Sequence, residues 1–106
     1  MEKIKAQLIL SCINNAPESF LPILMSAEVE TEAPNKKDFY QFFKGMLNHA
    51  HGSSEGELLL KIEQPTLDTD TEVHNYNFYD NAHKYPLLSI EVKENNNLIY
   101  LDVMPF

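Results

Sequence analysis

The segment that most constrains the fold of this 106-residue chain is residues 34–52, which carry the clearest helix signal. Asn35 is placed to cap the first turn, and Asp38 three residues later is placed to return a contact. Gly52 suits the left-handed residue that often ends a helix. Between these ends, apolar side chains recur at spacings of three and four. They are Phe39, Phe42, Phe43, Met46, Leu47 and Ala50. The sequence therefore predicts one long helix over residues 35–50.

Most of the remaining chain alternates between apolar and polar residues, the pattern of a half-buried strand. Strands are predicted at residues 3–12, 22–32, 57–63, 67–79, 87–93 and 98–104. The last two form a hairpin across residues 94–97, in which asparagines tolerate left-handed conformations. Its inward side chains are predicted to be Leu88, Ile90, Val92, Ile99, Leu101 and Val103. The fold prediction is α+β, with the long helix packed on one face of an antiparallel sheet of five or six strands.

Two shorter segments carry finer predictions. Asn15 and Glu18 could cap a short helix through Phe20, which Pro22 would stop early. In the strand at residues 57–63, the predicted inward side chains are Leu58, Leu60 and Ile62.

The length and the cysteine content indicate one domain, residues 1–106, in a reducing compartment. A chain of this size can bury a sufficient core without metal or disulfide. Cys12 is the only cysteine, and its apolar strand context is typical of a small core residue rather than of a nucleophile. The apolar run at residues 7–12 is too short for a membrane span or a usual signal peptide. A cytoplasmic location is therefore the prediction.

The charge balance argues against polyanionic partners. The chain has 16 acidic residues and a formal net charge of −8, and its eight basic residues are all lysines. Without arginine it lacks the bidentate donor that grips phosphate, and its net charge repels a polyanion. The sequence thus predicts no nucleic-acid or membrane partner, and favours a basic protein partner.

Two acidic combs are the feature with the clearest functional mechanism. Carboxylates occur at every second residue in Glu28, Glu30 and Glu32, and again in Asp68, Asp70 and Glu72. In extended chain each comb spaces its charges about 6.5–7 Å apart along one edge, so it could dock a basic surface. The alternative is that both combs are solvated strand faces whose charge prevents edge pairing.

Aromatic residues near the second comb offer a contact surface of a different kind. Tyr76 and Tyr79 lie beside asparagines, a combination that suits protein recognition. Tyr76 and Phe78 could equally cover an end of the core.

The histidines and the acidic stretch at residues 68–72 are the candidates for a metal site. His49 and His51, with Glu55, could share an ion only if residues 49–51 were extended, because on a helix the two rings diverge. Residues 68–72 resemble the opening of a calcium loop, but Val73 occupies the place of the required glycine. His74 and His83 fit no ligand spacing. No metal, cofactor or catalytic residue is predicted.

These observations favour a non-catalytic, inhibitor-like binding domain whose acidic strand edge engages a basic protein. The predicted contact residues are Glu28, Glu30, Glu32, Asp68, Asp70, Glu72, Tyr76 and Tyr79. One alternative is a self-assembling structural subunit, a homodimer or larger homo-oligomer, joined through sheet edges or aromatic faces. Another is a small metal-dependent enzyme built on His49 and His51.

Overall fold

A computed structural model describes residues 2–32, 35–62, 64–68, 70–95 and 98–104 of the chain. Its helices are α1 (Glu2–Ile13), the 3₁₀ turn η1 (Pro17–Ser19), α2 (Leu21–Leu24) and α3 (Lys36–Ser53). Its strands are β1 (Val29–Thr31), β2 (Leu59–Ile62), β3 (Thr66–Asp68), β4 (Thr71–Tyr79), β5 (Leu88–Asn95) and β6 (Leu98–Met104).

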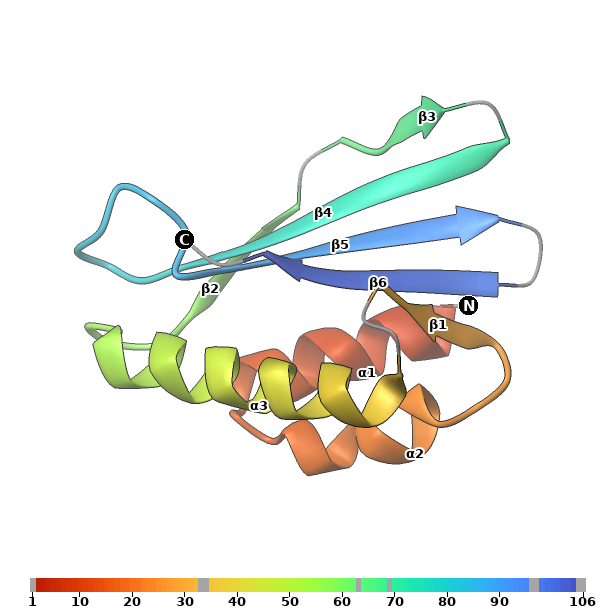
Figure 1. Ribbon diagram of the computed structural model, residues 1–106. Coiled ribbons are helices and arrows are strands. Elements are labelled where there is room, and N and C mark those ends of the chain that lie inside the picture. The colour runs from red at the N-terminus through yellow and green to blue at the C-terminus, as the bar shows by residue number, and fades with distance from the viewer. Residues whose placement is uncertain (1, 33–34, 63, 69, 96–97, 105–106) are drawn as a thin grey trace.

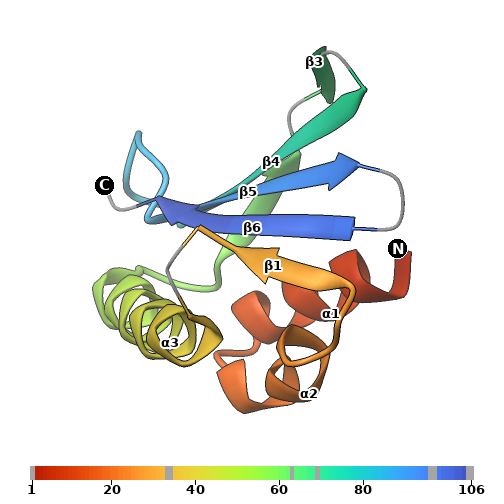
Figure 2. The same ribbon diagram turned by 45° about the vertical axis from the view of Figure 1, so that its right-hand side comes forward.

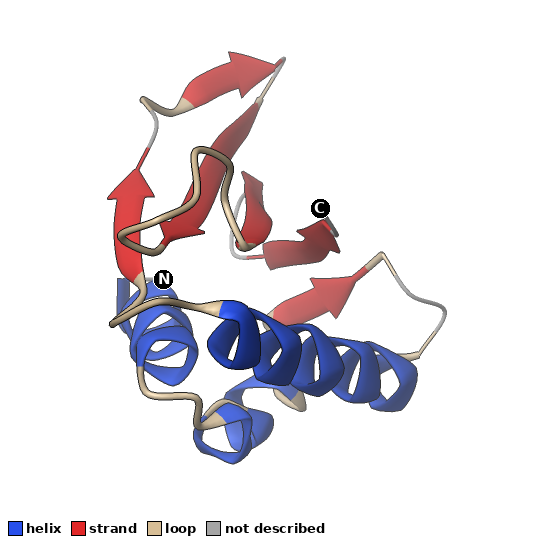
Figure 3. Cartoon of the chain, turned by 90° about the vertical axis from the view of Figure 1, so that its left-hand side faces the viewer, coloured by secondary structure: helices blue, strands red, loops and turns tan. Residues whose placement is uncertain are grey.

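The fold is α+β, with a six-stranded, mostly antiparallel sheet and the helices together on one of its faces (Figures 1 and 3). The strand order is β1-β6-β5-β4-β2, and β3 also pairs with β4. Among the strands of the described residues, β1 alone runs parallel to its neighbour, β6. The predicted sheet covered by one long helix is therefore confirmed, with a parallel edge strand that the alternation did not indicate.

Helix α3 forms because its first turn is capped and its inner face is apolar. The side chain of Asn35 accepts a hydrogen bond from Asp38 N at 2.8 Å, as the sequence predicts. The side chain of Asp38 contacts the Asn35 side-chain amide rather than its backbone. The helix continues through Gly52 to Ser53, so the predicted end at Gly52 is wrong, and the left-handed glycine is Gly56.

The core lies between the sheet and the helices. Phe43 of α3 is completely buried and packs against Phe20 and Phe39, with ring centroids 6.2 and 6.1 Å away. From the sheet, the six inward residues predicted for the β5–β6 hairpin are each no more than 4% exposed, which confirms the hairpin and its inward face. Phe42, predicted on the apolar stripe of α3, is instead 47% exposed.

The prediction of a strand at residues 3–12 is wrong, because this segment is the helix α1, which lies beside α3 under the sheet (Figure 2). Its buried residues fall at helical spacings. They are Ile4, Lys5, Leu8, Ser11 and Cys12. Ala6 and Leu10, which an alternating strand would bury, are exposed.

Asn15 ends α1 instead of starting the next helix. Its φ of 51° is left-handed, a conformation that asparagine tolerates. Ala16 N donates to Ser11 O, and Asn15 N donates to Cys12 O, which is the hydrogen-bond pattern of a Schellman motif. The following turn, η1, has no side-chain cap, so the predicted capping role of Asn15 is wrong.

The prediction of a strand at residues 22–32 holds only for Val29–Thr31. Pro22 lies in the first turn of α2, where its missing N–H is not needed, so it starts a helix instead of stopping one.

Two further boundaries differ from the predictions. Residues 67–79 are not one strand, because β3 turns back at Asp70 to pair with β4. In β2, Ile62 is 59% exposed although it was predicted to point inward. Leu58, just before β2, is buried, and Leu60 packs against the core. The predicted hairpin loop at residues 94–97 is too long, because Glu94 and Asn95 belong to β5, and residues 96–97 lie outside the described residues.

Candidate functional site

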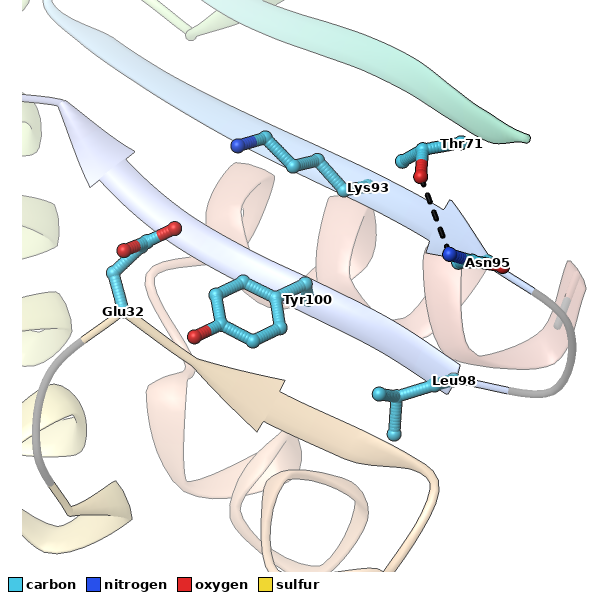
Figure 4. Close-up of a pocket in the computed structure, with 6 residues that line it drawn as sticks. All are labelled: Glu32, Thr71, Lys93, Asn95, Leu98 and Tyr100. Carbon is cyan, nitrogen blue, oxygen red and sulfur yellow. Dashed lines mark hydrogen bonds between the residues drawn. The ribbon is translucent and has the colours of Figure 1, made fainter. Parts of the chain in front are cut away.

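The sheet face opposite the helices is polar and charged. Side chains of β1, β6 and β5 alternate, and those that do not enter the core lie on this open face. They include Glu30, Glu91, Lys93, Tyr100 and Asp102. A pocket of about 350 Å³ lies on the same face, and Figure 4 shows its lining side chains in front of the strands with the helices behind. The pocket is lined by Glu32, Thr71, Lys93, Asn95, Leu98 and Tyr100.

Like charges meet on this face. Glu91 of β5 and Asp102 of β6 are directly opposite in the antiparallel register. Glu32 joins them because its backbone N–H donates to Leu101 O at 3.0 Å, which extends β1 along β6. Lys93 lies 3.3 Å from Glu91 (Nζ to Oε1). We call Glu32, Glu91, Lys93 and Asp102 the open-face cluster.

The pKa directions in the open-face cluster reflect this crowding. Burial raises the pKa of Asp102, and the charges of Glu32 and Glu91 raise it further against the opposing effect of Lys93. The pKa of Lys93 is raised by its hydrogen bond to Glu91 and by the neighbouring carboxylates. Three carboxylates thus share one ammonium group, which makes the face complementary to additional positive charge.

Neutralising Asp102 should stabilise the protein. Asp102→Asn removes a like-charge cross-strand contact, so we expect its free energy of unfolding at neutral pH to rise by about 0.2–1 kcal/mol. The raised pKa of Asp102 in the folded state means that the native protein binds this proton more readily than the unfolded chain does. The unfavourable charge is therefore present above that pKa and relieved as the pH falls through it. The advantage of Asp102→Asn should shrink in mildly acidic buffer.

Urea denaturation at both pH values measures this difference. Glu18→Gln, which removes an exposed charge from η1, is the control and should change stability by less than about 0.5 kcal/mol. A loss of stability in Asp102→Asn at neutral pH would contradict this account of the open face.

The first acidic comb is divided by the structure. Glu30 lies on β1 and Glu32 just after it, and both belong to the open face. Glu28 precedes the strand and lines a different depression with Ile4 and Ile23, on the side of α1 and α2.

The second acidic comb is divided as well. Asp68 on β3 is opposite Thr71 in the register, whereas Glu72 is opposite Leu67, because the chain reverses at the exposed Asp70. The side chain of Asp68 lies outside the described residues. Asp70 therefore lies in the turn and Glu72 in the next strand, β4, so these two carboxylates do not form the predicted continuous row.

The two predicted contact tyrosines have different environments. Tyr76 is 5% exposed and belongs to the core, which agrees with the alternative that it covers one end of it. Tyr79 is half-buried, and Lys61 Nζ lies 4.8 Å from its ring centroid.

The two histidines considered together for a metal site, His49 and His51, do not converge on one ion. His49 and His51 are both helical, so their rings diverge. His51 Nε2 instead lies 2.7 Å from Cys12 O, where it links α3 to the end of α1. Burial raises the pKa of Cys12, so its thiol remains protonated and acts as a core residue.

Asp80 anchors the loop after β4. Its buried carboxylate accepts hydrogen bonds from the backbone N–H groups of Glu55, Ala82 and His83, and lies 2.7 Å from His83 Nδ1. Burial opposes its negative charge, but these hydrogen bonds hold the pKa of Asp80 well below its usual range. This arrangement fixes a loop and leaves the carboxylate without basicity for proton transfer.

The prediction missed Glu91 and Asp102, although a signal for both was present. Alternation puts both residues on the outward side of the hairpin, although the predicted loop at residues 94–97 would place Glu91 opposite Tyr100. The observed pairing of Asn95 with Leu98 places Glu91 opposite Asp102 instead. The position of Glu32 depends on the parallel pairing of β1 with β6, for which the sequence offers no local signal.

Neither a membrane helix nor a known relative points to another site. None of the helices in the described residues is long and apolar enough to cross a membrane. The chain matches no protein-family model, and a search of curated proteins finds no match.

Proposed function

We propose that this protein is a non-catalytic binding domain that engages a basic protein through the open face of its sheet. The observation that carries the proposal is the open-face cluster, in which Glu91 and Asp102 are directly opposite and Glu32 lies beside them. Like charges in this position are unfavourable for the fold. A lysine or arginine side chain from a partner would offset that repulsion.

The surroundings of the cluster support a role in recognition. Tyr100 and Leu98 line the adjoining pocket, so an apolar and aromatic contact lies next to the charges (Figure 4). The net charge of −8 would steer a basic partner toward the protein and make association sensitive to salt. The sequence predicts an acidic contact along a strand edge, whereas this proposal uses a sheet face. Glu32 of the first comb belongs to both.

A paired charge experiment tests the proposal. Immobilised wild-type protein is used to capture proteins from its own cells, and the captured proteins are eluted with rising salt. Glu32→Gln/Asp102→Asn should lose the basic protein that the wild type retains, or release it at lower salt, because two charges leave the open face. The control is Glu18→Gln/Glu57→Gln, which removes two exposed charges from η1 and from the loop before β2.

Equal retention by both variants would contradict a role for the open face, since their net charges are identical. Equal loss in both would show that binding depends on net charge alone, which also contradicts it.

A second candidate, self-assembly, is favoured by one observation. Leu59 and Ile62 of β2 and Leu67 of β3 are exposed on the two strands that border β4 at the edge farthest from β1. An exposed apolar edge strand can pair with a strand of a second copy of the chain. Sedimentation velocity of the wild type over a range of concentrations separates the candidates. A fixed multimer without a basic partner favours self-assembly, whereas a monomer that captures one favours the binding domain.

A further inference from the structure

A second charged cluster lies on the opposite, helix-facing side of the sheet. Glu72 and His74 project from β4 on one face, and Glu94 of β5 is directly opposite Glu72. One nitrogen of His74 and one oxygen of each glutamate all lie within 4.8 Å of one another. The first turn of α1 approaches this end of the sheet (Figure 1). We call these three residues the Glu72–His74–Glu94 cluster.

His74 points a buried, unsatisfied nitrogen into this cluster. Its side chain is 9% exposed, and its Nε2 has no hydrogen-bond partner in the part of the chain that the structure describes. Nε2 is nevertheless 3.2 Å from Glu72 Oε1 and 3.7 Å from Glu94 Oε2. A buried nitrogen in a folded protein normally has a partner, and the atoms around this one are electron-pair donors.

The two distances from His74 Nε2 are close to the spacing of ligands around zinc. Zinc bonds to imidazole nitrogen and carboxylate oxygen are about 2.0–2.2 Å long, which separates ligand atoms of a tetrahedron by about 3.3–3.6 Å. The two separations from His74 Nε2, 3.2 and 3.7 Å, fall just below and just above that range, and an oxygen of Glu72 and one of Glu94 lie within 4.8 Å of each other. Calcium and magnesium prefer oxygen ligands alone, so the imidazole favours zinc.

Lys5 of α1 supports the geometry from outside the cluster. Its Nζ lies 2.7 Å from Glu94 Oε1 and 2.9 Å from Glu2 Oε1. This contact holds one oxygen of Glu94 and leaves the other, Oε2, toward His74. Groups that orient a ligating carboxylate in this way are a regular feature of metal sites.

We propose that Glu72, His74 and Glu94 bind a zinc ion, with the fourth position open to water. The ion would tie β4 to β5. It would offset the repulsion between Glu72 and Glu94, and it would give His74 Nε2 a bonding partner. The inference is independent of the basic partner, because the site is on the other face of the sheet.

Calorimetric titration of the chelator-treated full chain with zinc chloride tests the site. The expected result is one ion per chain. His74→Ala and Glu72→Gln should each weaken binding at least about tenfold. Glu72 is exposed, so its variant should keep the fold and remain informative if His74→Ala does not. His49→Ala, which removes an exposed histidine from α3, is the control and should bind zinc as the wild type does.

Three outcomes would overturn the proposal. One is the absence of zinc binding, which would leave the cluster as a contact between His74 and its two glutamates. Another is unchanged binding in both cluster variants. The third is loss of binding in His49→Ala, which would locate the ion on the helix.

Discussion

Phe43→Ala should lower the free energy of unfolding by about 3–5 kcal/mol, because it empties the centre of the core. The ring is fully buried and makes an edge contact with Phe20 and a stacked contact with Phe39. Phe20 lies between η1 and α2, and Phe39 is one turn earlier on α3 itself, so the substitution removes a contact between α3 and the segment that joins η1 to α2. Since an entire domain is commonly stable by only 5–15 kcal/mol, a loss of this size should be plain in urea denaturation.

The matched control for this prediction is the adjacent phenylalanine. Phe42 has the same side chain on the same helix, but it is 47% exposed. Phe42→Ala should cost much less, at most about 1.5 kcal/mol, because much of the ring is already in water. Equal losses in the two variants would mean that α3 is rotated about its axis relative to the structure.

Lys5→Met should lower the free energy of unfolding by about 1–3 kcal/mol, because it leaves a mostly buried carboxylate without its cation. Lys5 is only 9% exposed, and Glu94, 2.7 Å away, faces Glu72 across the strands. Burial opposes the charge of Lys5, but its contacts with Glu94 and Glu2 raise its pKa overall, so the side chain stays protonated.

Two comparisons isolate the contribution of this ion pair. Lys3→Met, on the exposed side of α1, should change stability by less than about 0.5 kcal/mol. The double variant Lys5→Met/Glu94→Gln should be more stable than Lys5→Met alone, since it also removes the unpaired charge. If Lys5→Met were no worse than Lys3→Met, α1 would not lie against β5 as described.

The helix α1 shows why a periodic pattern can mislead. Ile4 and Leu8 are four residues apart, a spacing that fits both a helix and a strand. Alternation also used Ala6 and Leu10, whereas the fold buries Lys5 and Cys12 instead. No sequence pattern could indicate that a lysine belongs inside, because its partner, Glu94, is at the other end of the chain.

The sequence predicts correctly those features that depend on contacts between residues close together in the chain. The cap of α3 at Asn35 and the β5–β6 hairpin rest on contacts between nearby residues, and both were predictable. The turn at Asp70 was missed because residues 67–79 alternate through it without glycine or proline.

The candidate site was only partly predictable for the same reason. The acidic character of the chain and the choice of Glu32 as a candidate follow from the sequence, but the surface joins β1, β5 and β6. Asp102 reaches Glu32 through a parallel pairing between strands that are distant in sequence. The Glu72–His74–Glu94 cluster likewise requires the register of β4 with β5, which are connected by a loop.

We propose that the open face of the sheet is where this protein binds positive charge. Two-dimensional amide NMR during titration with decalysine at low salt tests it directly. We expect the largest shift changes at Glu32, Glu91, Lys93, Tyr100 and Asp102, with little change along α3, and we expect Glu32→Gln/Asp102→Asn to suppress them. Changes spread evenly over the molecule, or concentrated on the helices, would contradict the claim.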